Sequence, residues 1–323
     1  MKYIVKIPLF LALFMCHQAA LGQSDDIQSF TSSVRQDQYL TIVNPYIPNK
    51  ISFAGQDIDF DNVDLYERLD RELTSMIYTH GNTLLTIKRA NRYFPIIIPI
   101  LKQYGLHSDF AYLACVESYL SPLAKSNVGA VGMWQFMPNT AKHYGLEVND
   151  EVDERYDVVK ETIAACKYIR NSFKIYGNWE SVAASYNAGT GRISKELETQ
   201  KQNSALNLWL VEETQRYPLR MIAMKMILEN PKSYGFQLTP EQLYQPYVYK
   251  EIQVDTAIED WPTWAEEQGI DYLTLRTHNP WIRAKKLTNK AGKSYTIKIP
   301  TKESTRRSTQ KQKTYNINWV ITQ

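Results

Sequence analysis

The sequence is short of the residues on which several classes of fold and site depend. Its 323 residues include only three cysteines and five histidines. So few cysteines exclude a fold held together by disulfides. The histidines are scattered and never form the His-Glu-x-x-His pattern of a zinc hydrolase, and no Gly-x-Ser-x-Gly nucleophile elbow is present. We therefore expect no metal and no cofactor.

Charge of one sign and long apolar runs are also scarce. The formal net charge is +3, which gives no argument for binding nucleic acid. After the first residues, no stretch is long and apolar enough to cross a bilayer. The most apolar segment, residues 95–101, is interrupted by two prolines and is followed by Lys102.

The first residues have the composition of a secretory signal peptide. Lys2 and Lys6 precede an apolar segment, residues 7–16, and Ala20-Leu21-Gly22 provides a small-x-small cleavage pattern. The apolar segment is too short to span a bilayer, although a short membrane anchor is the alternative. We expect an exported protein, and cleavage would lower its net charge to about +1.

Two cysteines, Cys115 and Cys166, lie outside this segment. Outside the cytoplasm they could form a disulfide. Both stand in apolar helical contexts, which favours two buried free thiols.

The remaining chain divides by composition and periodicity. Apolar residues recur every three or four positions in the middle of the chain, for example at Leu65, Leu69 and Leu73, which predicts helices. Alternation typical of strands is almost absent before residue 240 and then occurs at residues 247–254 and 294–300. The predicted organisation is a signal peptide over 1–22, an extended arm over 23–64, a mainly α domain over 65–239, a small α+β module over 240–301 and a basic flexible tail over 302–323.

Two local signals place helix ends within the α domain. Gly177 follows an apolar stripe that starts at Val159, so we expect it to end that helix. Pro218 precedes another stripe, and proline is tolerated in a first helical turn. We therefore expect a helix to begin at Pro218.

One carboxyl group stands on an apolar helix face. Ser108 can cap a helix through residue 120, and on it Glu117 shares a face with Leu113 and Leu120. Burial among apolar side chains disfavours the charged carboxylate and should raise the pKa of Glu117. A glutamate with a raised pKa suits a general acid at neutral pH, whereas the plainer interpretation is a structural ion pair.

Two further segments combine polar, aromatic and small residues. Gly129 and Gly132 precede Met-Trp-Gln-Phe-Met-Pro, and glycines let a backbone turn tightly next to a ligand. Residues 184–189 read Ala-Ser-Tyr-Asn-Ala-Gly at a helix end. Each segment alone could be an ordinary turn or loop without a role in function.

In combination these segments resemble the soluble-lytic-transglycosylase (SLT) domain family. The matching pattern is Glu117-Ser118, then Gly-x-x-Gly-Met-Trp-Gln-Phe-Met-Pro over 129–138, then Ala-x-Tyr-Asn-Ala-Gly over 184–189, then Glu213-Thr214-x-x-Tyr217. Four motifs in this order make a specific signal. The resemblance covers about residues 45–235 and is greatest to the membrane-bound murein transglycosylases.

The resemblance implies a lysozyme-like helical fold and an enzyme that cleaves peptidoglycan glycan strands. Its members break the β-1,4 bond after N-acetylmuramic acid without water and leave a 1,6-anhydromuramyl end. It also implies a periplasmic or outer-membrane-associated location in the cell envelope. Membrane association would arise only through that envelope, and we expect a monomer.

Roles in the site follow from the same resemblance. Glu117 would be the catalytic acid and then the base. The sugar and its N-acetyl group would be positioned along the cleft by Ser126, Gln135, Tyr186 and Asn187. Tyr217 would point into the site with Glu213 as its support, and Met133 would form part of the floor or wall. Trp134 would form a wall of the site or part of the core.

Residues 240–301 resemble a degenerate lysin motif (LysM), a βααβ unit that binds sugars. Asp255-Thr256 and Asn279-Pro280 support the likeness, whereas Val254 replaces the glycine expected before Asp255. The fold can persist without sugar binding.

Two alternatives for function stay open. A lysozyme-type hydrolase would need a second carboxylate to activate water, and Asp150, Asp153, Glu154 and Asp157 are available. A catalytically silent protein that only binds peptidoglycan is the other alternative, and the intact Glu117 argues against it.

Overall fold

The computed structural model describes residues 44–321. The predicted signal peptide over 1–22 and the first part of the predicted arm lie outside the described residues. Within 44–321, no helix has the length and apolar character that a membrane crossing requires.

The predicted arm contains a β-hairpin, which corrects the expectation of an extended segment. Strand β1 (Lys50–Phe53) pairs antiparallel with β2 (Gln56–Asp59) across a tight turn with positive φ at Ala54 and Gly55. Phe53 is fully buried, and its ring centroid lies 4.3 Å from that of Trp179. Strands of four residues have two positions per face, too few for a clear alternation in the sequence.

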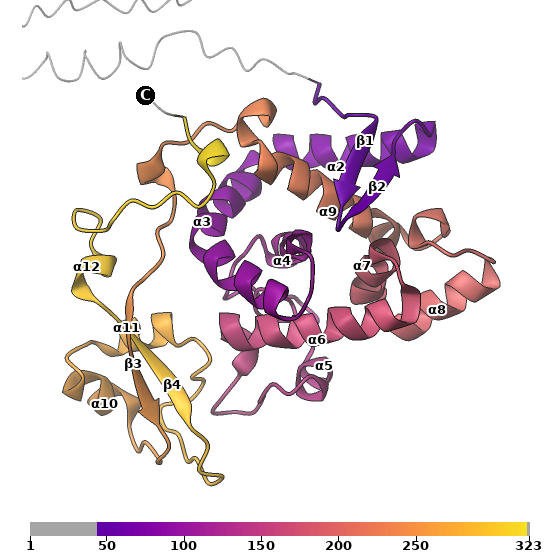
Figure 1. Cartoon of the computed structure of the whole chain (residues 1–323). Helices are drawn as coiled ribbons and strands as arrows, with labels where there is room; N and C mark the ends of the chain where they lie inside the picture. Colours follow the sequence, from indigo (N-terminus) through magenta and orange to yellow (C-terminus); the bar gives the residue numbers. More distant parts are fainter. Residues whose placement is uncertain (1–43, 322–323) are drawn as a thin grey trace, which may run out of the picture. The chain divides into compact units, whose positions relative to one another are not determined.

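Helices form most of the region between the hairpin and residue 230, as the periodicity predicts (Figure 1). The stripe predicted from Leu65 onward is buried in α2 at Leu69 and Leu73, and Asn62 caps this helix by accepting a hydrogen bond from the Leu65 N–H at 2.9 Å. Gly177 ends α6 in the left-handed conformation, also as expected. The helices are α2 (Val63–Tyr78), α3 (His80–Gln103), α4 (Ala111–Ser118), α5 (Pro138–His143), α6 (Val158–Tyr176), α7 (Trp179–Ala188), α8 (Thr190–Thr199) and α9 (Glu212–Glu229).

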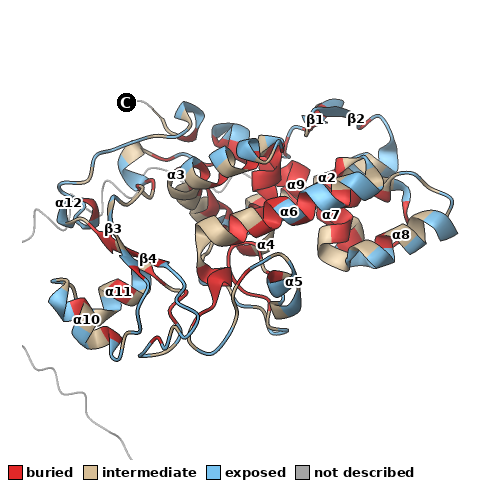
Figure 2. Cartoon of the chain, turned by 60° about the horizontal axis from the view of Figure 1, so that its bottom comes forward, coloured by how far each residue is buried: buried red, intermediate tan, exposed pale blue. Residues whose placement is uncertain are grey.

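Helix α9 runs through the core, and Figure 2 shows most of it buried. It begins at Glu212, so the prediction that Pro218 starts it is wrong. Pro218 lies inside the helix, where its missing N–H leaves the Thr214 carbonyl without its helical donor. The surrounding contacts of α9 with α2, α4 and α7 outweigh this loss. Cys115 and Cys166 are buried free thiols, which confirms that prediction.

The C-terminal module has the predicted strand-helix-helix-strand order. Strands β3 (Tyr249–Val254) and β4 (Tyr295–Pro300) pair antiparallel, and α10 (Trp261–Glu267) and α11 (Tyr272–His278) lie between them in the sequence. Trp261, Leu275 and Ile297 are fully buried in its core.

This module shares its core with residues of the helical domain. Val131, Val152 and Tyr156 belong to the same apolar cluster as Trp261 and Ile297. The contact is therefore apolar at its centre, and removing the module would expose these side chains to water.

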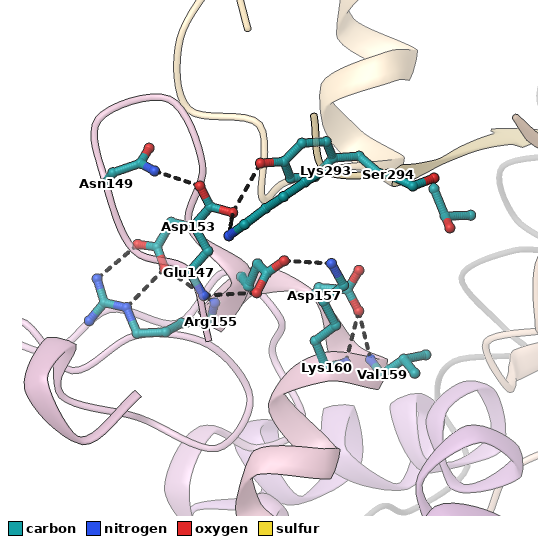
Figure 3. A network of polar contacts seen from close by, with 12 residues as sticks. Glu147, Asn149, Asp153, Arg155, Asp157, Val159, Lys160, Lys293 and Ser294 are labelled. Atoms are coloured by element: carbon teal, nitrogen blue, oxygen red, sulfur yellow. Dashed lines mark hydrogen bonds and ion pairs between the residues drawn. The ribbon is translucent and has the colours of Figure 1, made fainter. Parts of the chain in front are cut away.

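Polar contacts surround the shared core (Figure 3). Lys293 Nζ donates to Glu147 Oε2 at 2.9 Å, and the Tyr295 hydroxyl donates to the same oxygen at 3.0 Å. The Asp153 N–H donates to the Trp281 carbonyl at 2.9 Å. Main-chain and side-chain bonds thus hold the module against the segment that follows α5.

Residues 302–321 are mostly exposed, but a few contacts anchor them to the helical domain, which the prediction of a basic flexible tail did not include. After the short helix α12 (Lys302–Thr305), the chain returns to α3, where the Asn91 side chain bonds Lys313 and Tyr315 main-chain atoms at 2.9 and 2.8 Å. Trp319 is 2% exposed, and its indole N–H donates to the Leu228 carbonyl at 2.5 Å. The polar composition of this segment therefore did not predict that Trp319 is buried against the helical domain.

We expect Trp319→Ala to lower the free energy of unfolding by about 3 kcal/mol, because a large buried side chain is removed and a cavity remains. Urea unfolding followed by circular dichroism measures this. Leu273→Ala, at a side chain that is 76% exposed, is the control and should change stability by less than about 0.5 kcal/mol. Equal stabilities of the two variants would show that the tail contributes nothing to the fold.

Candidate active site

Glu117 lies in the last turn of α4. The predicted helix from Ser108 to residue 120 is shorter in the structure: a 3-10 turn over Ser108–Phe110 leads into α4, which ends at Ser118. His107, and not Ser108, caps this turn with its side chain. Tyr119 has a positive φ of 53° and ends the helix, so Leu120 is buried without being one helical turn beyond Glu117.

The carboxyl group of Glu117 accepts a hydrogen bond from a tyrosine of α9. Tyr217, in the second turn of α9, is 2% exposed and donates its hydroxyl hydrogen to Glu117 Oε1. Burial and the neighbouring Glu117 raise the pKa of Tyr217 well above its usual range, so it remains a phenol and a donor.

Burial raises the pKa of Glu117 to about 7, as its place on an apolar face predicts. The hydrogen bond from Tyr217 and the charge of Arg220 act in the opposite direction, while the charge of Glu213 raises the pKa further. Among the described residues, Glu117 forms no ion pair. The carboxyl can therefore exist in either protonation state near neutral pH.

The glycine-containing loop is bonded directly to the end of α4. The Ser118 hydroxyl donates to the Met133 carbonyl at 2.8 Å. Gly132 has a φ of +84°, and a Cβ atom there would stand 1.9 Å from the Arg155 carbonyl oxygen and 2.4 Å from Glu161 Oε2. Only glycine fits this position.

The predicted loop residues have different environments. Gln135 donates to the Gly132 carbonyl at 2.7 Å, and Ser126 Oγ accepts from the Ala130 N–H at 3.0 Å, so both side chains help to fold the loop. Met133 and Trp134 are fully buried in the main core, and the Trp134 indole N–H donates to Thr162 at 2.9 Å. The side chain of Met133 presents no surface to a ligand, so its placement favours packing over contact with sugar.

The end of α7 brings two more predicted residues to this region. The Tyr186 hydroxyl donates to the Trp134 carbonyl at 2.8 Å. Asn187 accepts a hydrogen bond from the Thr214 hydroxyl at 2.7 Å and donates to Glu213 Oε1 at 3.4 Å. The predicted residues of α4, the loop, α7 and α9 are thus joined by hydrogen bonds.

Sequence analysis missed two residues of this region. Glu161 in α6 is fully buried, its Oε2 accepts the Trp134 N–H at 3.1 Å, and burial raises the pKa of Glu161 well above its usual range. Its spacing of four from buried Ala165 was a signal that it faces inward. Arg220, three residues after Tyr217 on α9, is the other, and only the fold brings its charge near Glu117.

A hollow of about 350 Å³ adjoins this cluster. Tyr119 and residues of α9, including Glu213 and Arg220, line one part of it, and the C-terminal half of α2 with Thr79 lines the remainder. Among residues 44–321, no three His, Cys, Asp or Glu side chains converge as metal ligands.

The four acidic residues considered for activating water lie elsewhere. Asp153 pairs with Arg155 at 2.8 Å (Figure 3). Glu154 pairs with Lys160 at 2.5 Å. Asp157 caps α6 by accepting the Val159 N–H at 2.9 Å, and Asp150 is exposed. The acidic residue whose charge affects the pKa of Glu117 is Glu213.

Two stretches of the chain match known families. Residues 95–208 match the transglycosylase SLT domain, and residues 250–303 match the C-terminal LysM-like domain of soluble lytic transglycosylases. The first match includes Glu117 and ends before Glu213 and Tyr217. These matches and the element order confirm the predicted fold class, a mainly α lysozyme-like domain followed by a small α+β LysM-like module.

Two curated relatives have the same name and the same degree of similarity. Membrane-bound lytic murein transglycosylase D of Escherichia coli K12 is 30% identical over 296 residues, which cover 88% of this chain and 63% of that protein. The protein of that name from Escherichia coli O6:H1 gives the same values. The chain therefore spans 63% of the length of these relatives.

A solved structure is also similar over part of the chain. The 70 kDa soluble lytic transglycosylase of Escherichia coli is 19% identical with a TM-score of 0.39, over 50% of this chain and 30% of that one. A TM-score this low supports no argument about the fold, which stands on the family matches.

We expect Tyr217→Phe to raise the pKa of Glu117 above about 7. The hydroxyl of Tyr217 stabilises the ionised carboxylate in the parent protein, and the variant lacks this hydrogen bond. Carbon-13 NMR titration of labelled glutamate side chains measures the shift. Tyr168→Phe is the matched control, since the buried Tyr168 hydroxyl donates to the Ser185 carbonyl at 2.7 Å and does not touch Glu117. A lowered pKa in Tyr217→Phe, or equal shifts in both variants, would contradict this assignment.

Proposed function

Because the chain contains a transglycosylase SLT domain followed by a LysM-like domain, we propose that it is a peptidoglycan lytic transglycosylase with Glu117 as its acid and base. The observation that carries the proposal is the carboxyl of Glu117, which has a pKa of about 7, a hydrogen bond from Tyr217 and no competing ion pair within residues 44–321.

The proposed reaction needs one carboxyl group. Glu117 in its acid form gives its proton to the glycosidic oxygen, and the bond from that oxygen to the muramyl C1 breaks. Glu117, now a carboxylate, takes the proton of the muramyl 6-hydroxyl while that oxygen bonds to C1. The products are a 1,6-anhydromuramyl end and a free N-acetylglucosamine end, and no water is consumed.

The substrate supplies the remaining groups in this scheme. Its N-acetyl oxygen can stabilise the positive charge that develops at C1, as in the substrate-assisted glycosidases. The 6-hydroxyl belongs to the same sugar as C1, so its attack gains from proximity. A second catalytic carboxylate is unnecessary.

Neighbouring residues have supporting roles in the proposal. Tyr217 orients the Glu117 carboxyl and stabilises its charged form. We assign sugar positioning to Asn187, Tyr186, Ser126 and Gln135. Glu213 holds Asn187, whereas the buried Met133 is assigned to the support of the loop.

For the hydrolase alternative, Glu213 is the candidate among the described residues, because its charge acts on Glu117, whereas Asp153, Glu154 and Asp157 form other contacts and Asp150 is exposed. The side chain of Glu213 is exposed, and its Oε1 accepts the Asn187 side-chain amide at 3.4 Å. The alternative of a catalytically silent protein that only binds peptidoglycan is disfavoured by the pKa of about 7 at Glu117, because binding alone does not require a carboxyl group with a raised pKa.

The proposed location is the cell envelope after export. The relatives' name describes them as membrane-bound and as acting on murein. We extend the murein substrate to this chain, and we propose that it acts as a monomer.

We expect Glu117→Gln to reduce release of muropeptides from intact sacculi at least about 100-fold, because the amide cannot donate or accept the proton. Mass spectrometry of the products of the unaltered protein should give anhydromuropeptides, lighter by one water than hydrolysis products. Glu266→Gln, at an exposed residue of α10, is the charge-matched control and should retain activity. Near-normal release by Glu117→Gln, or products that contain the added water, would contradict the proposal.

The pH dependence should follow the proton on Glu117. The first step needs the acid form, so kcat/KM should fall as the pH rises above about 7, and Tyr217→Phe should move this fall to higher pH. Initial rates on soluble glycan fragments measure both. Tyr168→Phe, which alters a tyrosine away from Glu117, should keep the parent profile. A profile that stays flat from about pH 6 to about pH 9 would exclude Glu117 as the acid.

A further inference from the structure

Trp209 is exposed, unlike the other tryptophans of the chain. The sequence contains seven tryptophans, and all lie in the described range. Five are buried and Trp264 is partly buried, whereas Trp209 is 82% exposed. It lies in the connection between α8 and α9 (Figure 1), next to Val211, which is also exposed.

The backbone at Trp209 is held in place although its indole is exposed. Gln200 Oε1 accepts the Trp209 N–H at 2.8 Å, and Gln200 Nε2 donates to the Trp209 carbonyl at 2.9 Å. This paired contact fixes the main chain from which the indole projects. Binding of a ligand to the indole would therefore cost little conformational entropy in the main chain.

Trp209 borders a hollow of about 460 Å³ between the start of α2 and the start of α9. The Arg68 guanidinium forms part of the lining and donates to the Leu206 and Gln215 carbonyls at 3.2 and 3.3 Å. The rim is polar: the side-chain amides of Asn207 and Gln215 have no partner among the described residues, and Asp64 lies 3.4 Å from Arg68.

An indole face beside amides and one ion pair matches the chemistry of a pyranose ring. The sugar has a flat C–H face that packs on an aromatic ring, and hydroxyl or N-acetyl groups around its edge that bond amide donors and acceptors. A protein partner would instead favour a broader apolar centre than one indole and one valine side chain.

The hollow is also close to the candidate active site along the chain. Val211 is followed directly by α9, whose first turn carries Glu213, the hydrogen-bond partner of Asn187. Trp209 and Tyr217 are eight positions apart, three steps along extended chain and five along the helix, so their Cα atoms are at most about 20 Å apart. A polymeric glycan bound at Glu117 can extend over this distance.

We propose that Trp209 and its hollow form a subsite for an N-acetylhexosamine unit of the glycan strand, away from the bond that is cleaved. This inference rests on the proposed function, because it takes the occupant to be part of the same substrate. The subsite adds binding and not chemistry, so its loss should raise KM on long strands with little effect on kcat.

The test uses the full chain with Glu117→Gln, which prevents turnover, and the β-1,4 tetramer of N-acetylglucosamine as the probe. Because Trp209 is the most exposed tryptophan, binding should shift its fluorescence and protect it from acrylamide. Adding Trp209→Ala should weaken binding about tenfold and abolish the fluorescence change, while Trp209→Tyr, which keeps an aromatic face, should lose less. Ile317→Ala, at an exposed apolar residue that lines neither hollow and lies outside the LysM-like module, should bind like the parent.

Equal binding by the parent and Trp209→Ala, or a parent that does not bind the tetramer, would overturn the subsite. Circular dichroism of each variant shows that the fold is retained. The proposed function fails on a different result, namely no anhydromuropeptides released from sacculi by the unaltered chain. A chain that releases these products with the same KM on long strands with and without Trp209 would keep the function and lose the subsite.

Discussion

The site depends on one buried contact, the hydrogen bond from Tyr217 to the carboxyl of Glu117. Burial favours the neutral acid, whereas this bond and the charge of Arg220 favour the ion, and the balance places the pKa of Glu117 near 7. The two partners are 100 positions apart in the sequence. Helices α4 and α9 must therefore pack closely before the pKa of this carboxyl reaches about 7, so the proposed chemistry depends on the packing of the core.

Buried side chains form hydrogen bonds with the main chain of the loop beside Glu117. Ser118 bonds the Met133 carbonyl, and Glu161 accepts the Trp134 N–H in a fully buried position. Gly132 removes the one side chain that would collide with this arrangement. Each hydrogen bond pairs a main-chain group that would otherwise be costly to bury, so these backbone groups are satisfied without any ligand.

The C-terminal part of the chain contributes to the same molecule in two ways. The LysM-like module closes the apolar cluster that contains Val131 and Tyr156, next to the loop, and Glu147 bonds it through Lys293. The last residues return to α3 and α9 through Trp319. Parts that composition marked as separate or loose thus stabilise the helical domain, and the proposed sugar subsite at Trp209 uses a surface that they leave open.

The sequence by itself determined the helical periodicity, the βααβ order of the module, the free thiols and the raised pKa expected of Glu117, because these depend on spacing along one element. It missed the β-hairpin around Phe53, the packing of Trp319 and the inward position of Glu161, and it placed the start of α9 wrongly at Pro218. Short strands and single anchors leave too few residues for a periodic signal. Only the tertiary structure decided which distant groups meet Glu117, because burial and charge act through space and not along the chain.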